Sequence, residues 1–140
     1  MLARIGRSTR SLHALAALWI AYGIAHFVFS SETLRQVPPY FPLKEALVCT
    51  TGVLEIALGA GLLPRRTRHF AALGLLLLLA AYLPAIVYMF GNDVLPVSWP
   101  AWLRATTRAW IFPHHVLLTL WVWAHFTADG SRARHFAQPR

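Results

Sequence analysis

The sequence predicts an all-α fold, an integral membrane four-helix bundle with both termini in the cytoplasm. Two observations on composition support this class, since 57% of the 140 residues are hydrophobic and only 13% are charged. A soluble domain usually carries about 25% charged residues. The third observation is that the apolar residues gather into four long runs, separated by short polar or proline-rich segments.

The four runs predict a single transmembrane domain over residues 1–140. A helix needs about 20 mainly apolar residues to cross a hydrocarbon core of about 30 Å, and each run approaches that length. Pro84 lies in the third run and is expected to kink that helix, because proline removes a backbone donor and clashes with the preceding turn. The expected helices cover about 12–29, 44–63, 69–90 and 109–127.

Two of the connections are expected to lie at the membrane surface. Segment 30–42 contains Pro38, Pro39 and Pro42. Because proline cannot continue a helix across the bilayer, we expect an ordered interfacial loop there. Segment 91–108 is the longest connection and is rich in tryptophan, which favours the level of the lipid headgroups. We expect a surface loop in this segment, with room for a short interfacial helix.

The basic residues predict the orientation of the bundle. The amino-terminal segment, the second connection and the tail carry three Lys or Arg each, whereas the first and third connections carry two each. Cytoplasmic segments carry the excess of positive charge, so both termini are placed in the cytoplasm. This bias and anionic lipid explain the net charge of +8, and no nucleic-acid partner is expected. The cytoplasmic set is Arg4, Arg7, Arg10, Arg65, Arg66, Arg68, Arg132, Arg134 and Arg140.

Glu55 is the most costly residue of the expected bundle. It lies near the middle of the second run, where an ionisable group is expensive unless a partner or a water-filled cavity meets it. Helical spacing places Glu55 on one face with Gly52 and Gly59, and places His26 on one face with Gly23. Small residues allow close helix packing around a buried polar contact. We therefore expect these three glycines to bring His26 toward Glu55.

Further polar residues fall near the same depth. His114 and His115 lie near the outer end of the fourth run, and only one of them is expected to face the interior, because adjacent helical residues point about 100° apart. Arg35 lies in the first outer connection. We expect one of these three side chains to join His26 and Glu55 around a pocket that opens outward.

Neither a metal nor a cysteine-based redox site is assigned. No His-x-x-x-His or Glu-x-x-His spacing occurs at membrane depth, and Cys49 is the only cysteine. A single cysteine excludes an internal disulfide, a CxxC pair and a cysteine-based zinc site. No cofactor motif is visible either.

Each candidate residue also has a structural interpretation. Glu55 and His26 can hold two helices together through a hydrogen bond across the bundle. His114 and His115 can anchor the start of a helix at the interface. Both interpretations stay open at this point, and no catalytic residue is assigned.

Four motifs follow one another along the first two-thirds of the chain. They are Gly-Ile-Ala-His-Phe at 23–27, Arg-Gln-Val-Pro-Pro-Tyr-Phe-Pro at 35–42, Thr-Gly-Val-Leu-Glu-Ile-Ala-Leu-Gly at 51–59, and Leu-Pro-Ala at 83–85. Together they resemble the DoxX-like family of small bacterial membrane proteins. The resemblance implies a four-helix bundle in the bacterial inner membrane, with His26, Arg35, Pro38 and Glu55 at the characteristic positions of that family.

The resemblance also implies a link to redox chemistry. One branch of that family is linked to a membrane subunit of thiosulfate:quinone oxidoreductase, which suggests that the pocket around His26 and Glu55 accepts a quinone head group. An oxidoreductase activity would need an electron donor on a partner protein, since no redox cofactor motif is visible. Two other hypotheses are a non-catalytic accessory or structural subunit of a larger membrane complex, and a small-solute transporter.

Overall fold

Helices α2 to α7 form the part of the fold that the structure, a computed structural model, describes. The described residues are 5–6, 8–92, 94–96 and 98–136, and their side chains are described as far as residue 128. Within these ranges the fold is all-α. Of the basic residues that predict the orientation, Arg4, Arg7 and Arg140 lie outside the described residues.

The first half of the fold consists of α2 (Thr9–Val28), α3 (Ser30–Gln36) and α4 (Lys44–Gly61). The side chain of Ser8 accepts a hydrogen bond from the Ser11 amide and so caps the start of α2. The expectation of a loop over 30–42 was wrong in its first half, because α3 occupies that part. A proline disfavours the helical conformation of the residue directly before it, and Val37 before Pro38 is extended. The residues up to Gln36 are not restricted in this way, so the helix ends there.

The second half consists of α5 (Arg68–Ala81), α6 (Leu83–Gly91) and α7 (Ala101–Phe136). The expected helix over 69–90 is broken at Tyr82, because Pro84 has no amide hydrogen to donate to the preceding turn. The helix expected over 109–127 is longer than expected and begins at Ala101. The amides of Leu103 and Arg104 bond to the carbonyl of Pro100, which starts the helix early.

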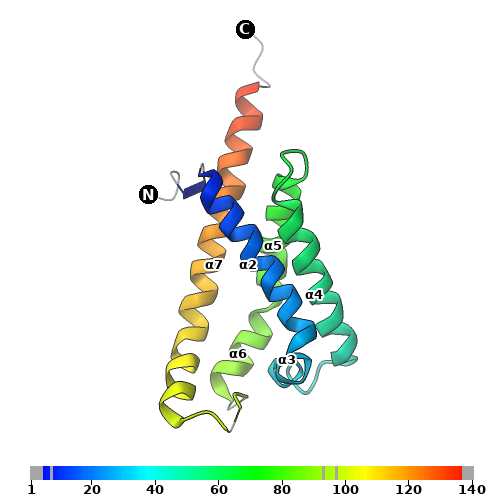
Figure 1. The fold of residues 1–140 in the computed structure, drawn as a ribbon, viewed down its shortest axis with the longest axis vertical. Helices are drawn as coiled ribbons and strands as arrows, with labels where there is room; N and C mark the ends of the chain where they lie inside the picture. Colours follow the sequence, from blue (N-terminus) through cyan, green and yellow to red (C-terminus); the bar gives the residue numbers. More distant parts are fainter. Residues whose placement is uncertain (1–4, 7, 93, 97, 137–140) are drawn as a thin grey trace.

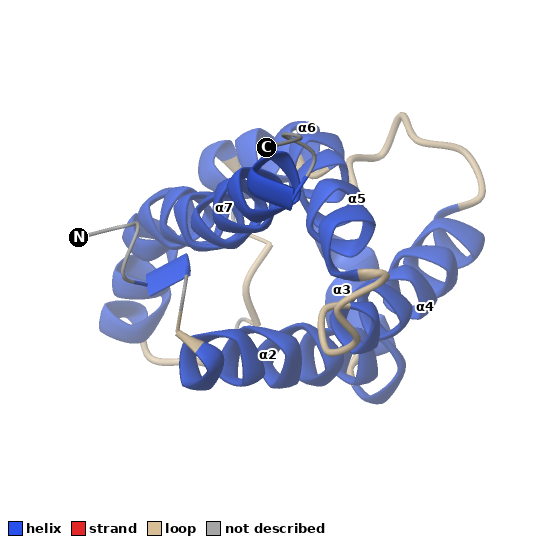
Figure 2. Cartoon of the chain, turned by 90° about the horizontal axis from the view of Figure 1, so that it is seen from above, coloured by secondary structure: helices blue, strands red, loops and turns tan. Residues whose placement is uncertain are grey.

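The helices form a bundle with two distinct ends. Figure 1 shows that α2 begins and α7 ends at the same end of the bundle as the α4–α5 connection. Helix α3 and the α6–α7 connection lie at the other end, which we call the α3 end. Seen from above, α2 and α4 follow one side of the bundle, and α5, α6 and α7 follow the other (Figure 2).

Glycines bring α2 and α4 into close contact. A Cβ atom added at Gly23 would lie 2.5 Å from the carbonyl oxygen of Gly52, and one added at Gly59 would lie 3.1 Å from the carbonyl oxygen of Ala16. The backbones can approach this closely only because no side chain stands between them. Away from this crossing, the apolar core is built around Leu15, Trp19, Leu62, Leu75, Leu79 and Val122.

The surface of the bundle is strongly apolar. Phe70, Leu77 and Val87 are 73%, 64% and 69% exposed. Thr9–Val28 and Arg68–Gly91 are long and apolar enough to cross a membrane, and 28% of each apolar window is buried inside the bundle. Length and composition alone define these two candidate spans, and a core helix of a soluble protein meets the same criterion. The exposed apolar side chains are a separate observation, since soluble monomers rarely expose large contiguous apolar patches.

Candidate functional site

A cavity of about 400 Å³ lies near the α3 end, between α2, α4, the α5–α6 break and α7. Its volume falls within the range of about 300–1,000 Å³ that is typical of small-molecule sites. Its polar and aromatic lining comes from residues far apart in the sequence, including Trp19, Tyr22, His26, Glu55, Tyr82, His114 and His115. Glu32 of α3 also lines this cavity and is exposed, so the cavity reaches the surface beside α3.

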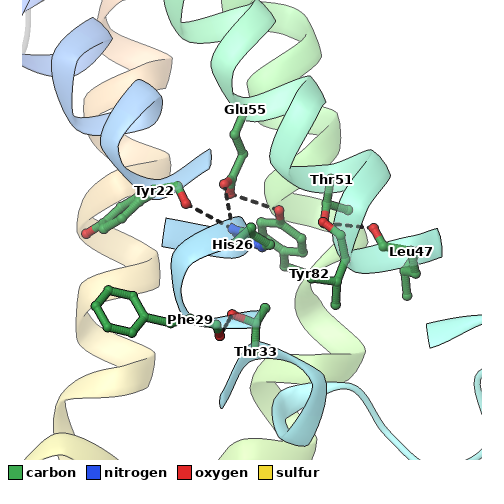
Figure 3. Close-up of polar contacts among 9 residues, drawn as sticks. Tyr22, His26, Phe29, Thr33, Leu47, Thr51, Glu55 and Tyr82 are labelled. Atoms are coloured by element: carbon green, nitrogen blue, oxygen red, sulfur yellow. Dashed lines mark hydrogen bonds and ion pairs between the residues drawn. The ribbon is translucent and has the colours of Figure 1, made fainter. Parts of the chain in front are cut away.

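Glu55 lies in the wall of this cavity and is only 2% exposed. It belongs to the face of α4 that is buried against α2, together with Gly52 and Gly59. The hydroxyl of Tyr82 donates a hydrogen bond to Oε1 of Glu55 at 2.8 Å. Nδ1 of His26 lies 3.1 Å from Oε2 (Figure 3). The expected approach of His26 to Glu55 therefore occurs in the structure, and Tyr82 joins the pair.

His26 has two oxygen neighbours but one hydrogen to share between them. Its Nδ1 lies 3.0 Å from the backbone carbonyl of Tyr22, one helical turn earlier. A carbonyl oxygen can only accept, so Nδ1 carries a hydrogen that it donates to Tyr22. Oε2 of Glu55 is within ion-pair distance of the same nitrogen but has no aligned hydrogen bond. The Nδ1 hydrogen of His26 therefore lies between two acceptors, the Tyr22 carbonyl and Oε2 of Glu55.

Both histidines of the α7 pair line the cavity, so the expectation that only one faces the interior was wrong. His114 Nε2 pairs with the hydroxyl of Tyr22 at 2.8 Å, and the two rings meet edge to face. His115 is 8% exposed. The side chains of His114 and His115 leave α7 about 100° apart, and the cavity is wide enough for both to reach its wall.

Arg35 is exposed on α3 and is not among the residues that line the cavity. Glu32 and Thr33 lie four and three positions before Gln36, and these three residues form the cavity-facing side of α3 and leave Arg35 on another side. At the cavity mouth, the hydroxyl of Ser31 donates to the carboxylate of Glu32 at 2.7 Å, and this bond lowers the pKa of Glu32.

A second cavity of about 290 Å³ adjoins the first and is mainly apolar. The two cavities share residues of α2, α3 and α6, and His26 and Tyr82 line both. The remaining lining of the second cavity includes Val37, Pro38, Phe41, Leu47, Val48 and Ala85. Both cavities are mainly apolar, and they meet at His26 and Tyr82.

Three contributors to the site were missed by sequence reasoning. Trp19, Tyr22 and Tyr82 were not among the expected site residues, and all three lie in the apolar runs. The spacing of Trp19, Tyr22 and His26, three and four positions apart, places them on one face of α2 and could have indicated the first two. Among the described residues, no group of three or more His, Cys, Asp and Glu side chains is placed to hold a metal ion.

This geometry defines a small all-α bundle with a carboxylate, histidine and tyrosine network in the wall of a cavity. The chain belongs to the family described as Domain of unknown function (DUF8561), which it matches over residues 15–126. The matched region includes every residue of the network. No curated protein and no solved structure matches the chain.

Proposed function

We propose that the protein is a multi-pass protein of the bacterial inner membrane whose cavity binds the head group of a quinone, as a redox-associated component. The observation that carries this proposal is the network of His26, Glu55 and Tyr82 in the wall of a cavity that also holds His114 and His115. Such a set of donors and acceptors in a mainly apolar site is typical of sites that orient a small ring.

The membrane location is supported by the surface of the bundle. The candidate spans Thr9–Val28 and Arg68–Gly91 carry exposed apolar side chains that a bilayer would cover. The beginning of α2, the α4–α5 connection and the end of α7 share one end of the bundle (Figure 1). The sequence places its basic clusters in these three regions, so we propose that this end faces the cytoplasm and that the α3 end faces outward.

The quinone is supported by the resemblance to the DoxX-like family, whose motifs in this sequence include His26 and Glu55. The pair of cavities supports the same ligand class. A membrane quinone joins a polar ring to an apolar tail, and here two mainly apolar cavities adjoin at the side chains of His26 and Tyr82.

The residues around the ring could handle protons. Reduction of a quinone takes up protons as well as electrons, and a histidine beside a carboxylate can pass them. A quinone-linked oxidoreductase activity would take its electrons from a partner protein, as expected from a sequence in which no redox cofactor motif is visible. The role proposed for this chain is to bind and orient the ring.

A non-catalytic accessory subunit is the second candidate, and the same contacts favour it. Glu55 on α4 connects His26 on α2 with Tyr82 at the α5–α6 break, so the network also fastens three parts of the bundle. A purely structural network would stabilise the protein for docking to a larger complex and would hold no ligand.

The test is the total quinone, in both redox forms, that is retained when the protein is purified from the membrane fraction. We expect bound quinone in the wild type, and a loss of about tenfold or more in Glu55→Ala and His26→Ala. Losing a hydrogen bond to a charged group costs about 1.5–3 kcal/mol, and about 1.4 kcal/mol corresponds to tenfold in affinity.

Matched controls are available on the same helices. Glu45 of α4 and His13 of α2 are exposed, so Glu45→Ala and His13→Ala should retain wild-type quinone. Unchanged quinone in both cavity variants would remove the quinone site and leave the accessory subunit.

A further inference from the structure

The second cavity lies between two helices that do not pack against each other. Leu47 and Thr51 of α4 line one part of its wall, and Ala85 and Met89 of α6 line another. No Cα atom of α4 lies within 8 Å of a Cα atom of α6. Phe41, in the connection between α3 and α4, lines the same cavity. We call this space, with its lining from α4 and α6, the α4–α6 gap.

The α4–α6 gap reaches the apolar surface of the bundle. Leu47 and Ala81 line the second cavity, and both are exposed. Leu54, two turns after Leu47 on the same face of α4, is also exposed, as is Phe90 near the end of α6. On the membrane location proposed above, hydrocarbon covers these side chains. A hydrophobic molecule in the bilayer would therefore meet the gap without passing through water.

The wall of the α4–α6 gap offers apolar contact and little hydrogen bonding. The residues that line the second cavity but not the first are all apolar except Thr51. The Thr51 hydroxyl donates to the backbone carbonyl of Leu47 at 2.9 Å, and the Thr33 hydroxyl donates to that of Phe29 at 3.0 Å (Figure 3). Because both hydroxyls are satisfied by backbone one turn earlier, a chain without polar groups matches this wall.

The inner end of the gap meets the first cavity. His26, Tyr82, Ile86 and Met89 line both cavities, so a ligand held beside His26 and Tyr82 has the gap directly next to it. The mouth of the first cavity beside α3 is different in character, because the exposed carboxylate of Glu32 lines it. A charged mouth disfavours the passage of a hydrocarbon chain, whereas the gap carries no charged side chain.

We infer that the ligand enters from the bilayer through the α4–α6 gap, and that its hydrocarbon tail stays in the gap while its ring lies beside His26 and Tyr82. This inference rests on the proposed function and specifies the ligand class, a ring with a single hydrocarbon tail. The close glycine crossing of α2 and α4 leaves no space for a tail between those helices, since a Cβ atom at Gly23 would already lie 2.5 Å from the carbonyl oxygen of Gly52.

The role of the gap is to give the tail a place rather than to add affinity. A tail that moves from the bilayer into the gap exchanges one apolar environment for another, so little hydrophobic free energy is gained. Filling the gap with a protein side chain should consequently exclude a ligand with a tail and spare a ligand without one.

The experiment compares duroquinone, a ring whose substituents are all methyl groups, with the same ring carrying a decyl chain in place of one methyl group. Binding is measured by titration calorimetry on the full-length protein in phospholipid nanodiscs, with empty nanodiscs as the blank. The wild type should bind both. Thr51→Phe and Ala85→Phe, on the two walls of the gap, should weaken binding of the decyl ligand by about tenfold or more, which corresponds to about 1.4 kcal/mol. Both variants should bind duroquinone as the wild type does.

Matched controls lie on the same two helices. Val53 of α4 and Val87 of α6 are exposed and line neither cavity, so Val53→Phe and Val87→Phe should bind both ligands at the wild-type level. Circular dichroism and thermal unfolding identify any variant that loses its fold, and the smaller Ala85→Leu takes the place of such a wall variant.

The outcomes separate this inference from the proposed function. Wild-type binding of the decyl ligand by both folded wall variants would overturn the entry route and leave the quinone site intact. Equal weakening of both ligands would also overturn it, because the gap would then hold the ring and not the tail. A phospholipid chain resident in the gap would likewise make the two ligands respond alike. Binding of neither ligand to the wild type would overturn the proposed function and the inference together.

Discussion

The two ends of the α2–α7 interface bury polar side chains in different ways. Away from the α3 end, Ser11 of α2 lies between two residues of α7. Nε1 of Trp121 donates to its hydroxyl at 2.8 Å, and Nε2 of His125 lies 3.1 Å from the same oxygen. None of these three residues lines either of the two cavities described above. We call this group the serine cluster.

Toward the α3 end, Tyr22 of α2 reaches His114 of α7, and Trp19 lies one turn before Tyr22. The contrast between the two tryptophans is direct. The indole N–H of Trp121 has an acceptor in Ser11, whereas the indole N–H of Trp19 has none and Trp19 lines the cavity.

The difference shows what a buried polar residue does in this bundle. In the serine cluster, the Ser11 hydroxyl of α2 pairs with the side chains of Trp121 and His125 on α7. These contacts hold α2 and α7 together. At the cavity, Glu55 contacts both His26 and Tyr82, and the indole N–H of Trp19 has no acceptor among the described residues. The polar contacts beside the cavity are therefore accompanied by space for a ligand, whereas neither cavity is lined by the serine cluster.

The largest effect is expected from blocking the α2–α4 crossing, on which the cavity end depends. In Gly23→Ala, the new methyl group would lie 2.5 Å from the carbonyl oxygen of Gly52, and a backbone atom cannot move aside easily. We expect a loss of stability of about 3 kcal/mol in thermal unfolding, together with loss of bound quinone. Gly91→Ala is the control, because a methyl group there meets nothing within 4 Å. A wild-type melting temperature for Gly23→Ala would show that the crossing is looser than the structure indicates.

A smaller effect, confined to stability, is expected from the serine cluster. Ser11→Ala removes the oxygen that accepts from Trp121 and contacts His125, so the unfolding free energy should fall by about 1–2 kcal/mol. Quinone retention should stay at the wild-type level, because this cluster lies outside both cavities. Ser30→Ala, at an exposed serine, should change neither quantity. Lost quinone in Ser11→Ala without lost stability would contradict the division between the two ends.

Sequence reasoning found the approach of His26 to Glu55 because both residues lie on helical faces marked by glycine. Gly23 lies three positions before His26, and Gly52 lies three positions before Glu55, so a single close crossing determines the whole contact. A spacing of three or four residues is sufficient to predict such a contact, since each helix is regular through it.

Sequence reasoning did not assign Tyr82, the third member of the network, to the site. Tyr82 stands at the break between α5 and α6, and Pro84 changes the direction in which the following residues point. The spacing could have indicated it, since Tyr82 lies seven, four and three positions after the buried residues Leu75, Leu78 and Leu79 and so continues their face of α5. The presence of α3 was missed because the prolines of segment 30–42 were taken to exclude helix from the whole segment. The early start of α7 was missed because segment 91–108 was expected to be a surface loop with room only for a short helix of its own.

The smallest effect is expected from Tyr22→Phe, and its size tests whether the two ends differ in access to water. The variant removes the hydroxyl that pairs with His114 Nε2 at 2.8 Å. His114 lines the cavity, so water can take the place of the lost hydroxyl, and the unfolding free energy should fall by only about 0.5 kcal/mol. Tyr40→Phe, at a tyrosine that is 70% exposed, provides the baseline for removing a hydroxyl. A loss as large as that of Ser11→Ala would mean that the cavity excludes water as the serine cluster does, and that any ligand enters a dry site.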